Sequence, residues 1–276
     1  MIRGLALLFW CFLSGGSALA ADLPRPLLVF AGSASQPPLE EAARLFEART
    51  GMHVSLHLGG SGAMLSQIRL TGQGDLFIPG SPDYLEIARE QHLVEGEATV
   101  LAYLVPAIIV AKGNPLRIQS LDDLARPNLK VGIANPDGVC VGLYAAEILT
   151  ANGVAEKVKP NLRGQVESCA RAASMIPLGM ADAVLGWREF AAWNPAAMEP
   201  VLLRPEQVPR LAFVPAVKVR GSGNPLAAAA FTEFLTSADG AAIFRKWGYM
   251  TREDEVRALA PKARIGGVYR LPEGWQ

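Results

Sequence analysis

Three loops of small residues hold the side chains best suited to chemistry in this chain of 276 residues. The loops are residues 32–35 (GSAS), 59–62 (GGSG) and 137–142 (DGVCVG), and each is expected to follow a strand and to open a helix. The first amides of a helix have no intrahelical partner, and the helix dipole favours negative charge there, so such a loop suits an anion. A single loop of this kind is more often an ordinary helix cap than an anion site.

Catalysis and metal binding are the competing explanations for these loops. Residues 59–63 (GGSGA) approach the nucleophile elbow G-x-S-x-G, but the one histidine downstream of Ser61 is His92, 31 residues later. A hydrolase sheet and its acid need more chain than that, so a serine hydrolase is the weaker alternative. His53 and His57 would lie about 13 Å apart along a strand, too far for one metal, so no metal site is expected.

Strand-like and helix-like segments alternate around these loops. The pattern predicts an α/β fold with parallel-rich sheets flanked by helices, in which the loops at the carboxyl ends of the strands form the ligand site. The expected strands are 26–31, 52–58, 75–78, 103–111, 129–134, 183–185 and 211–219. The expected helices are 39–50, 63–70, 82–90, 120–124 (capped by Ser120), 141–151, 169–178, 225–235 and 238–247.

Two such α/β units are expected, connected through the strand-like segments near residues 104 and 213. The predicted first lobe comprises residues 22–104 and 216–276, and the predicted second lobe comprises residues 105–215. The last 26 residues are rich in proline and glycine and are expected to form an irregular tail.

The first twenty residues have the features of a secretory signal peptide. Arg3 is followed by an apolar run over residues 5–13 and by Ala18-Leu19-Ala20, which predicts cleavage after Ala20 and a periplasmic location. The apolar run is too short for a membrane span, although an uncleaved anchor is the alternative. The chain has 26 basic and 26 acidic residues, which argues against a nucleic-acid or anionic-membrane partner.

The predicted cleavage determines which cysteines remain in the mature chain. Cys11 lies in the predicted leader, so the mature chain keeps Cys140 and Cys169. Two thiols in an oxidising compartment are most often paired, and a disulfide between them is expected. The alternatives are two separate buried thiols, or a thiolate that contacts the ligand.

Several segments resemble the periplasmic molybdate-binding proteins of ABC importers. The likeness extends over about residues 26–250, and each segment is short, so it is their order and spacing together that carry the resemblance. The segments include residues 29–33 (VFAGS), 60–62 (GSG), 74–78 (GDLFI), 135–137 (NPD), 142–145 (GLYA) and 179–183 (GMADA).

The resemblance implies a two-lobed type II periplasmic binding protein that holds an oxyanion in its cleft and has no cofactor and no chemical step. Family proteins use serine hydroxyls, backbone amides and a tyrosine hydroxyl for this. One family serine corresponds to Ser61, the other to Ala34, and the tyrosine corresponds to Trp187. The implied ligand-binding positions are Ser33, Ala34, Ser35, Ser61, Val141, Cys169 and Trp187.

The resemblance also implies the ligand and the partners. The expected ligand is molybdate or tungstate, and the expected partner is an ABC permease in the inner membrane that receives the anion from a monomeric binding protein. Sulfate, phosphate or a small organic acid is the alternative ligand, and a periplasmic sensor module is the alternative use of the same fold.

Overall fold

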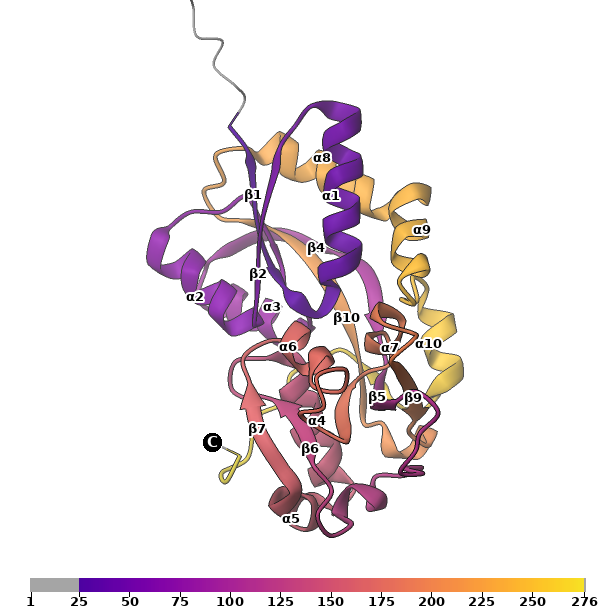
Figure 1. The fold of residues 1–276 in the computed structure, drawn as a ribbon. Helices are drawn as coiled ribbons and strands as arrows, with labels where there is room; N and C mark the ends of the chain where they lie inside the picture. Colours follow the sequence, from indigo (N-terminus) through magenta and orange to yellow (C-terminus); the bar gives the residue numbers. More distant parts are fainter. Residues whose placement is uncertain (1–24, 276) are drawn as a thin grey trace, which may run out of the picture.

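Two β-sheets, each flanked by helices, form the two lobes of the molecule (Figure 1). The structure is a computed structural model that describes residues 25–275. The predicted signal peptide, residues 1–20 with Cys11, lies outside the described residues. Within residues 25–275 no helix combines the length and the apolar character that crossing a membrane requires.

The first sheet contains the strands at both ends of the described chain. Its order is β11-β10-β3-β1-β2, with β4 paired to β10. Strand β1 runs parallel to β2 and β3, whereas β10 runs antiparallel to β3 and β4, so the predicted parallel core has an antiparallel extension. The strands are β1 (Leu27–Gly32), β2 (Val54–Gly59), β3 (Leu76–Ile78), β4 (Val94–Leu104), β10 (Arg210–Val219) and β11 (Arg264–Ile265).

The predicted helices of the first lobe are all present. In α1 the apolar positions Leu39, Ala42 and Phe46 are buried on one face, and the helix ends at Gly51, whose φ of 73° is a left-handed conformation that glycine adopts without strain. The aromatic rings of Phe46 and Phe231 pack at 5.1 Å and join α1 to α8. The helices are α1 (Gln36–Thr50), α2 (Ser61–Thr71), α3 (Pro82–Glu90), α8 (Pro225–Thr236) and α9 (Ala238–Lys246).

The second sheet has the order β7-β6-β8-β5-β9 and its own buried core. The central pairs β6–β7 and β6–β8 are parallel, and β5 is antiparallel to β8 and β9. Its strands are β5 (Pro106–Ala111), β6 (Val131–Ala134), β7 (Leu162–Val166), β8 (Ala183–Trp187) and β9 (Met198–Leu202). Its helices are α4 (Cys140–Ala151), α5 (Ala155–Val158), α6 (Cys169–Ser174) and α7 (Phe190–Trp193).

Two connections carry the chain between the sheets. The prediction of one continuous strand over residues 103–111 is wrong, because the strand breaks at Val105: β4 belongs to the first sheet and β5 to the second. Pro106 has no amide hydrogen, so it cannot continue the hydrogen-bond ladder of β4. The chain returns between β9 and β10 through residues 203–209. The lobe boundaries at 105 and 216 stay a prediction.

The C-terminal segment is more regular than predicted. It contains α10 (Glu253–Leu259) and β11, so the expectation of an irregular tail is wrong for these residues. The Tyr269 amide donates to Asp83 Oδ1 on α3 at 2.9 Å, and Trp275 Nε1 donates to Thr150 Oγ1 on α4 at 3.2 Å. The end of the chain therefore contacts both lobes.

A buried ion cluster lies between the lobes at the start of β10. Arg210 is 1% exposed, and it donates from Nε to Glu147 Oε2 on α4 at 2.7 Å and from Nη1 to Asp83 Oδ1 on α3 at 3.0 Å. Its guanidinium carbon lies 4.3 Å from the centre of the Tyr144 ring. Burial raises the pKa of Glu147, and Arg210 opposes that rise. One arginine thus neutralises a carboxylate from each lobe.

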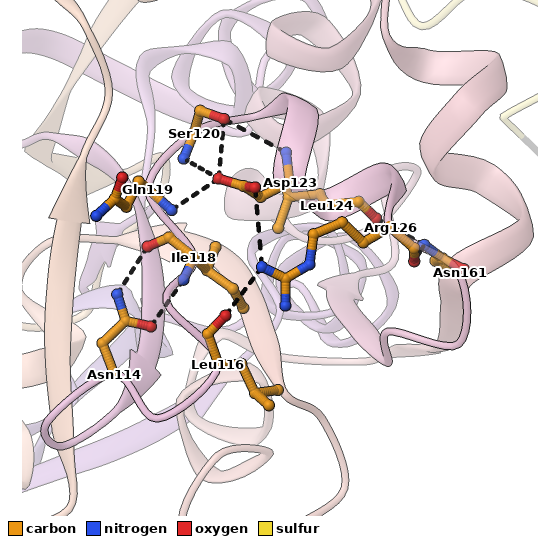
Figure 2. Close-up of polar contacts among 9 residues, drawn as sticks. All are labelled: Asn114, Leu116, Ile118, Gln119, Ser120, Asp123, Leu124, Arg126 and Asn161. Atoms are coloured by element: carbon orange, nitrogen blue, oxygen red, sulfur yellow. Dashed lines mark hydrogen bonds and ion pairs between the residues drawn. The ribbon is translucent and has the colours of Figure 1, made fainter.

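A polar network fixes the loop between β5 and β6 (Figure 2). Asn114 exchanges two hydrogen bonds with the backbone of Ile118, at 2.7 and 2.9 Å. Asp123 Oδ2 accepts from the amides of Gln119 and Ser120, and Ser120 Oγ accepts from the Asp123 amide. The 3-10 helix η2 (Asp122–Ala125) begins after Leu121, so the prediction of a helix over residues 120–124 capped by Ser120 is wrong by one residue at the cap. The bonds between Ser120 and Asp123 still hold the turn that leads into η2.

We expect Asp123→Ala to lower the free energy of unfolding at pH 7 by about 1–2 kcal/mol, because it removes the acceptor of the hydrogen bonds from the Gln119 amide and from the amide and hydroxyl of Ser120. The amide of Gln119, followed by Ser120, lowers the pKa of Asp123. The difference in free energy of unfolding between the wild type and Asp123→Ala should therefore be fully present at pH values above the ordinary aspartate pKa. It should shrink as the pH falls through the lowered pKa. Urea unfolding measures this difference. Asp122→Ala, an exposed neighbour, is the control, and an equal loss in both variants would contradict the prediction.

Candidate functional site

Loops from both lobes converge on Gly80, which lies between β3 and α3. A Cβ atom added to Gly80 would lie 2.6 Å from Cys140 Sγ and 2.8 Å from the Ala34 Cβ atom. The same position is 3.7 Å from Ser61 Oγ. The structure therefore brings all three predicted loops together at one point. They can approach each other there because Gly80 has no side chain.

Ser61 is the first residue of α2 and is 1% exposed. Its Oγ accepts a hydrogen bond from the Gly80 amide at 3.0 Å. A Cβ atom at Gly32 would lie 2.6 Å from the same oxygen, so the close approach of β1 to Ser61 requires a glycine there. The hydroxyl is thus fixed at the carboxyl edge of the first sheet, facing the second lobe.

The loop after β1 forms the 3-10 helix η1 (Ser33–Ser35), whose three residues are all buried. Ser33 Oγ accepts from the Ala170 amide of the second lobe at 3.2 Å. The Ala34 carbonyl accepts from the Tyr249 hydroxyl. Ser35 Oγ is fully buried and has no hydrogen-bond partner among the residues that the structure describes. This loop therefore offers one hydroxyl in a bond across the interface and one that is unpaired.

The second lobe meets these loops with two helix starts. Helix α4 begins at Cys140, with Val141 buried as its second residue, and α6 begins at Cys169. Beside them, the Gly62 amide donates to the Gly138 carbonyl at 3.0 Å, and the Tyr84 hydroxyl donates to the Asp137 carbonyl at 3.2 Å. The lobes are therefore in direct contact at the predicted site.

Trp187 ends β8 and is fully buried. Its ring packs edge-on against Tyr144, with the ring centres 5.0 Å apart. Neither the Trp187 Nε1 atom nor the Tyr144 hydroxyl has a hydrogen-bond partner within residues 25–275. Burying a hydrogen-bond donor without a partner costs free energy. A ligand bound next to the Trp187 side chain could accept its hydrogen bond.

The predicted disulfide between Cys140 and Cys169 is not present. The two Sγ atoms lie 3.5 Å apart, whereas a disulfide bond is about 2.05 Å long. Both thiols are buried and, in the described part of the chain, free. Burial raises the pKa of Cys140 well above its ordinary value, Cys169 adds to the rise, and the neighbouring indole N–H of Trp187 opposes it. The Cys140 thiol is therefore neutral.

Some residues of the site had a signal in the sequence, and others had none. Gly80 and Ser81 follow a strand and precede a helix, as in the three predicted loops, so the same criterion applied to residues 79–81 would have found them. Ser81 Oγ is buried and unpaired among the described residues. Tyr249, in contrast, follows α9 with no pattern to single it out.

The arrangement offers neutral hydrogen-bond donors at an interface between two lobes. Among residues 25–275, no group of three or more His, Cys, Asp or Glu side chains is placed to hold a metal ion. A cavity of about 420 Å³ lies elsewhere, between β4, β10 and α8, and none of the predicted ligand-binding residues lines it. Hydroxyl, indole and backbone donors in a buried interface suit a small anion whose oxygens can accept from several directions.

Comparison with known proteins identifies relatives over most of the chain. Residues 27–250 match the family of bacterial extracellular solute-binding proteins. A putative binding protein of Haemophilus influenzae is 25% identical over 234 residues, which are 85% of this chain and 93% of that protein. The molybdate-binding protein ModA of Rhodobacter capsulatus is 26% identical over 244 residues, 86% of this chain and 92% of that protein.

A solved structure gives the same architecture. The sulfate-binding protein SubI from Mycobacterium tuberculosis superposes with a TM-score of 0.75 at 16% identity, covering 87% of this chain and 94% of that one. At this identity the match concerns the fold alone. It confirms the expected two-lobed fold of type II periplasmic binding proteins.

Proposed function

The chain belongs to the bacterial extracellular solute-binding proteins, and we propose that it captures a small tetrahedral oxyanion, in the first place molybdate or tungstate, for delivery to an ABC permease. The family and the fold are those of solute-binding proteins and not of enzymes. Export with cleavage after Ala20, a periplasmic location and a monomeric state are parts of the same proposal.

One observation carries the proposal: the convergence of the small-residue loops of both lobes on Gly80. Ser61 Oγ and the Gly80 amide lie at the carboxyl edge of the first sheet, where ligands bind in open α/β sheets. Ser35 Oγ, Ser81 Oγ and Trp187 Nε1 are buried without partners among the described residues, so an anion could accept their hydrogen bonds. These donors are held in place before binding, so little ordering remains to be done when the anion arrives.

Molybdate is favoured by the relative named above as a molybdate-binding protein, whose alignment covers 86% of this chain at 26% identity. Sulfate is the second candidate, because the superposed structure is that of a sulfate-binding protein. The residues differ from those of the resembled family at Ala34 and Trp187, where the family has a serine and a tyrosine. These differences lie at the ligand positions, so they bear on which anion fits.

Isothermal titration of the mature protein with molybdate, tungstate, sulfate, phosphate and a small carboxylate tests the proposal. We expect one anion per chain, with molybdate or tungstate binding most tightly. No heat with any member of the panel would contradict the proposed ligand class.

Ser61→Ala should weaken that binding about tenfold or more, because losing a hydrogen bond to a charged ligand costs about 1.5–3 kcal/mol. Ser66→Ala is the matched control, since Ser66 lies on the same helix and is only half-buried. Equal affinities of the two variants would remove Ser61 from the site.

A further inference from the structure

The family resemblance places two thiols next to the expected position of the anion. Cys140 and Cys169 are 1% and 2% exposed, and their sulfur atoms lie 3.5 Å apart at the starts of two helices. Cys140 Sγ also contacts the first lobe, because a Cβ on Gly80 would lie 2.6 Å from it. A ligand held by both sulfurs would therefore sit at the interface of the two lobes, beside Ser61.

The distance between the sulfur atoms determines the bond angle at any atom that bridges them. With two bonds of about 2.3 Å, the length of a zinc–thiolate bond, sulfurs 3.5 Å apart subtend about 100° at the bridging atom. That angle belongs to a pyramidal or tetrahedral centre and not to a linear one. A linear two-coordinate ion would need the sulfurs about 1 Å further apart.

The protein supplies two soft ligands to such a centre but no third. Within residues 25–275 no group of three or more His, Cys, Asp or Glu side chains is placed around a common point. A tetrahedral zinc site built from the protein would lack two of its four ligands. A centre that brings its own oxygen fits better, because the unpaired indole N–H of Trp187 lies beside Cys140 and can donate to that oxygen.

We propose that Cys140 and Cys169 together bind a trivalent, thiol-reactive oxyacid of the arsenite class. The inference rests on the proposed function of the chain as a solute-binding protein, and it assigns a second ligand class to the same site. The step is a condensation without redox change: As(OH)₃ reacts with two thiols, two As–O and two S–H bonds break, two As–S bonds form, and two water molecules leave. The third arsenic substituent is a hydroxyl, which remains at the interface.

The charges of the site agree with this step. The buried Cys140 thiol is neutral, since burial raises its pKa well above the ordinary value. Arsenous acid is neutral at physiological pH, so it brings no charge into the closed interface, where an unpaired charge is costly. The thiols also consume no oxidant, because arsenic is trivalent before and after the reaction.

Titration of the reduced mature protein with sodium arsenite, under anaerobic conditions, tests the proposal. Intact mass should show one arsenic per chain, with both thiols protected from a thiol reagent. Cys140→Ser and Cys169→Ser should each lower the affinity about 100-fold or more, because each leaves one bond in place of a chelate. Sodium arsenate, a pentavalent tetrahedral anion, should form no adduct. Melting curves establish that the serine variants fold, and Cys→Ala variants replace them if they do not.

Three results would overturn the proposal. The first is a protein that, before reduction, is lighter by two hydrogens and inert to arsenite, which would show a disulfide. The second is an arsenite affinity of the urea-unfolded chain equal to that of the folded one, which would show a chance dithiol. The third is molybdate binding without arsenite binding, which would leave the proposed function intact. Arsenite binding without binding of any tetrahedral oxyanion would support the inference and contradict molybdate as the ligand.

Discussion

Arg210→Met is expected to lower the free energy of unfolding by about 3–5 kcal/mol, the range measured when one partner is removed from a buried ion pair. Methionine keeps much of the side-chain volume but leaves Asp83 and Glu147 without their cation at 1% and 7% exposure. Two buried carboxylates then repel each other and lack compensation. Urea unfolding at pH 7 measures the loss.

Two controls make the Arg210 result specific. Arg204→Met removes an exposed arginine six residues earlier, whose ion pair with Glu206 lies in solvent, and should change stability by less than about 1 kcal/mol. The triple variant with Asp83→Asn, Glu147→Gln and Arg210→Met should recover most of the loss, because no unpaired charge remains. A loss below about 1 kcal/mol for Arg210→Met alone would contradict the role assigned to the cluster.

Glu189→Gln is expected to make the free energy of unfolding less dependent on pH. Glu189 is 1% exposed beside the connection between the lobes, where its Oε2 accepts from the Val105 amide at 3.4 Å. Burial raises its pKa from an ordinary 4.5 to about 7, against the opposing charge of Arg188. The folded protein therefore prefers the protonated acid.

The raised pKa fixes the direction of the effect. The stabilisation is fully present below the ordinary pKa of 4.5 and is lost as the pH rises through about 7. Between about pH 4 and pH 8 the wild type should lose about 3 kcal/mol more than Glu189→Gln does, since one pKa unit corresponds to 1.36 kcal/mol. Urea unfolding of both proteins across this range gives the difference, and parallel pH profiles would refute it.

The alternation of apolar runs and amphipathic segments made most of the fold predictable. Strands that are buried on both faces, such as β1 and β3, are continuous apolar runs, and helix α3 begins and ends at the predicted residues. Strands β7 and β9 were missed for a physical reason. They lie at the two edges of the second sheet, and β9 contains Pro200 while β7 contains Gly164 at a φ of 77°.

The candidate site was predictable only in part. Loop composition pointed to Ser61 and to the helix start near Cys140, because amides at the carboxyl ends of strands follow from the order of elements. Cys169 entered the predicted site only through the family resemblance. The distance between Cys140 and Cys169 could not be predicted. An oxidising compartment and the presence of two cysteines suggest a disulfide, whereas the two helix starts hold the sulfur atoms 3.5 Å apart. The ion cluster around Arg210 was also invisible, because Asp83, Glu147 and Arg210 are distant in sequence and meet through packing.

The contacts of the C-terminal segment have a mechanical consequence. Two connections, at Val105 and at residues 203–209, join the lobes and are the places where one lobe could rotate against the other. Residues 269–275 form a third link, from Asp83 in the first lobe to Thr150 in the second. Any rotation that separates Asp83 from Thr150 must therefore stretch this segment or break one of its two contacts.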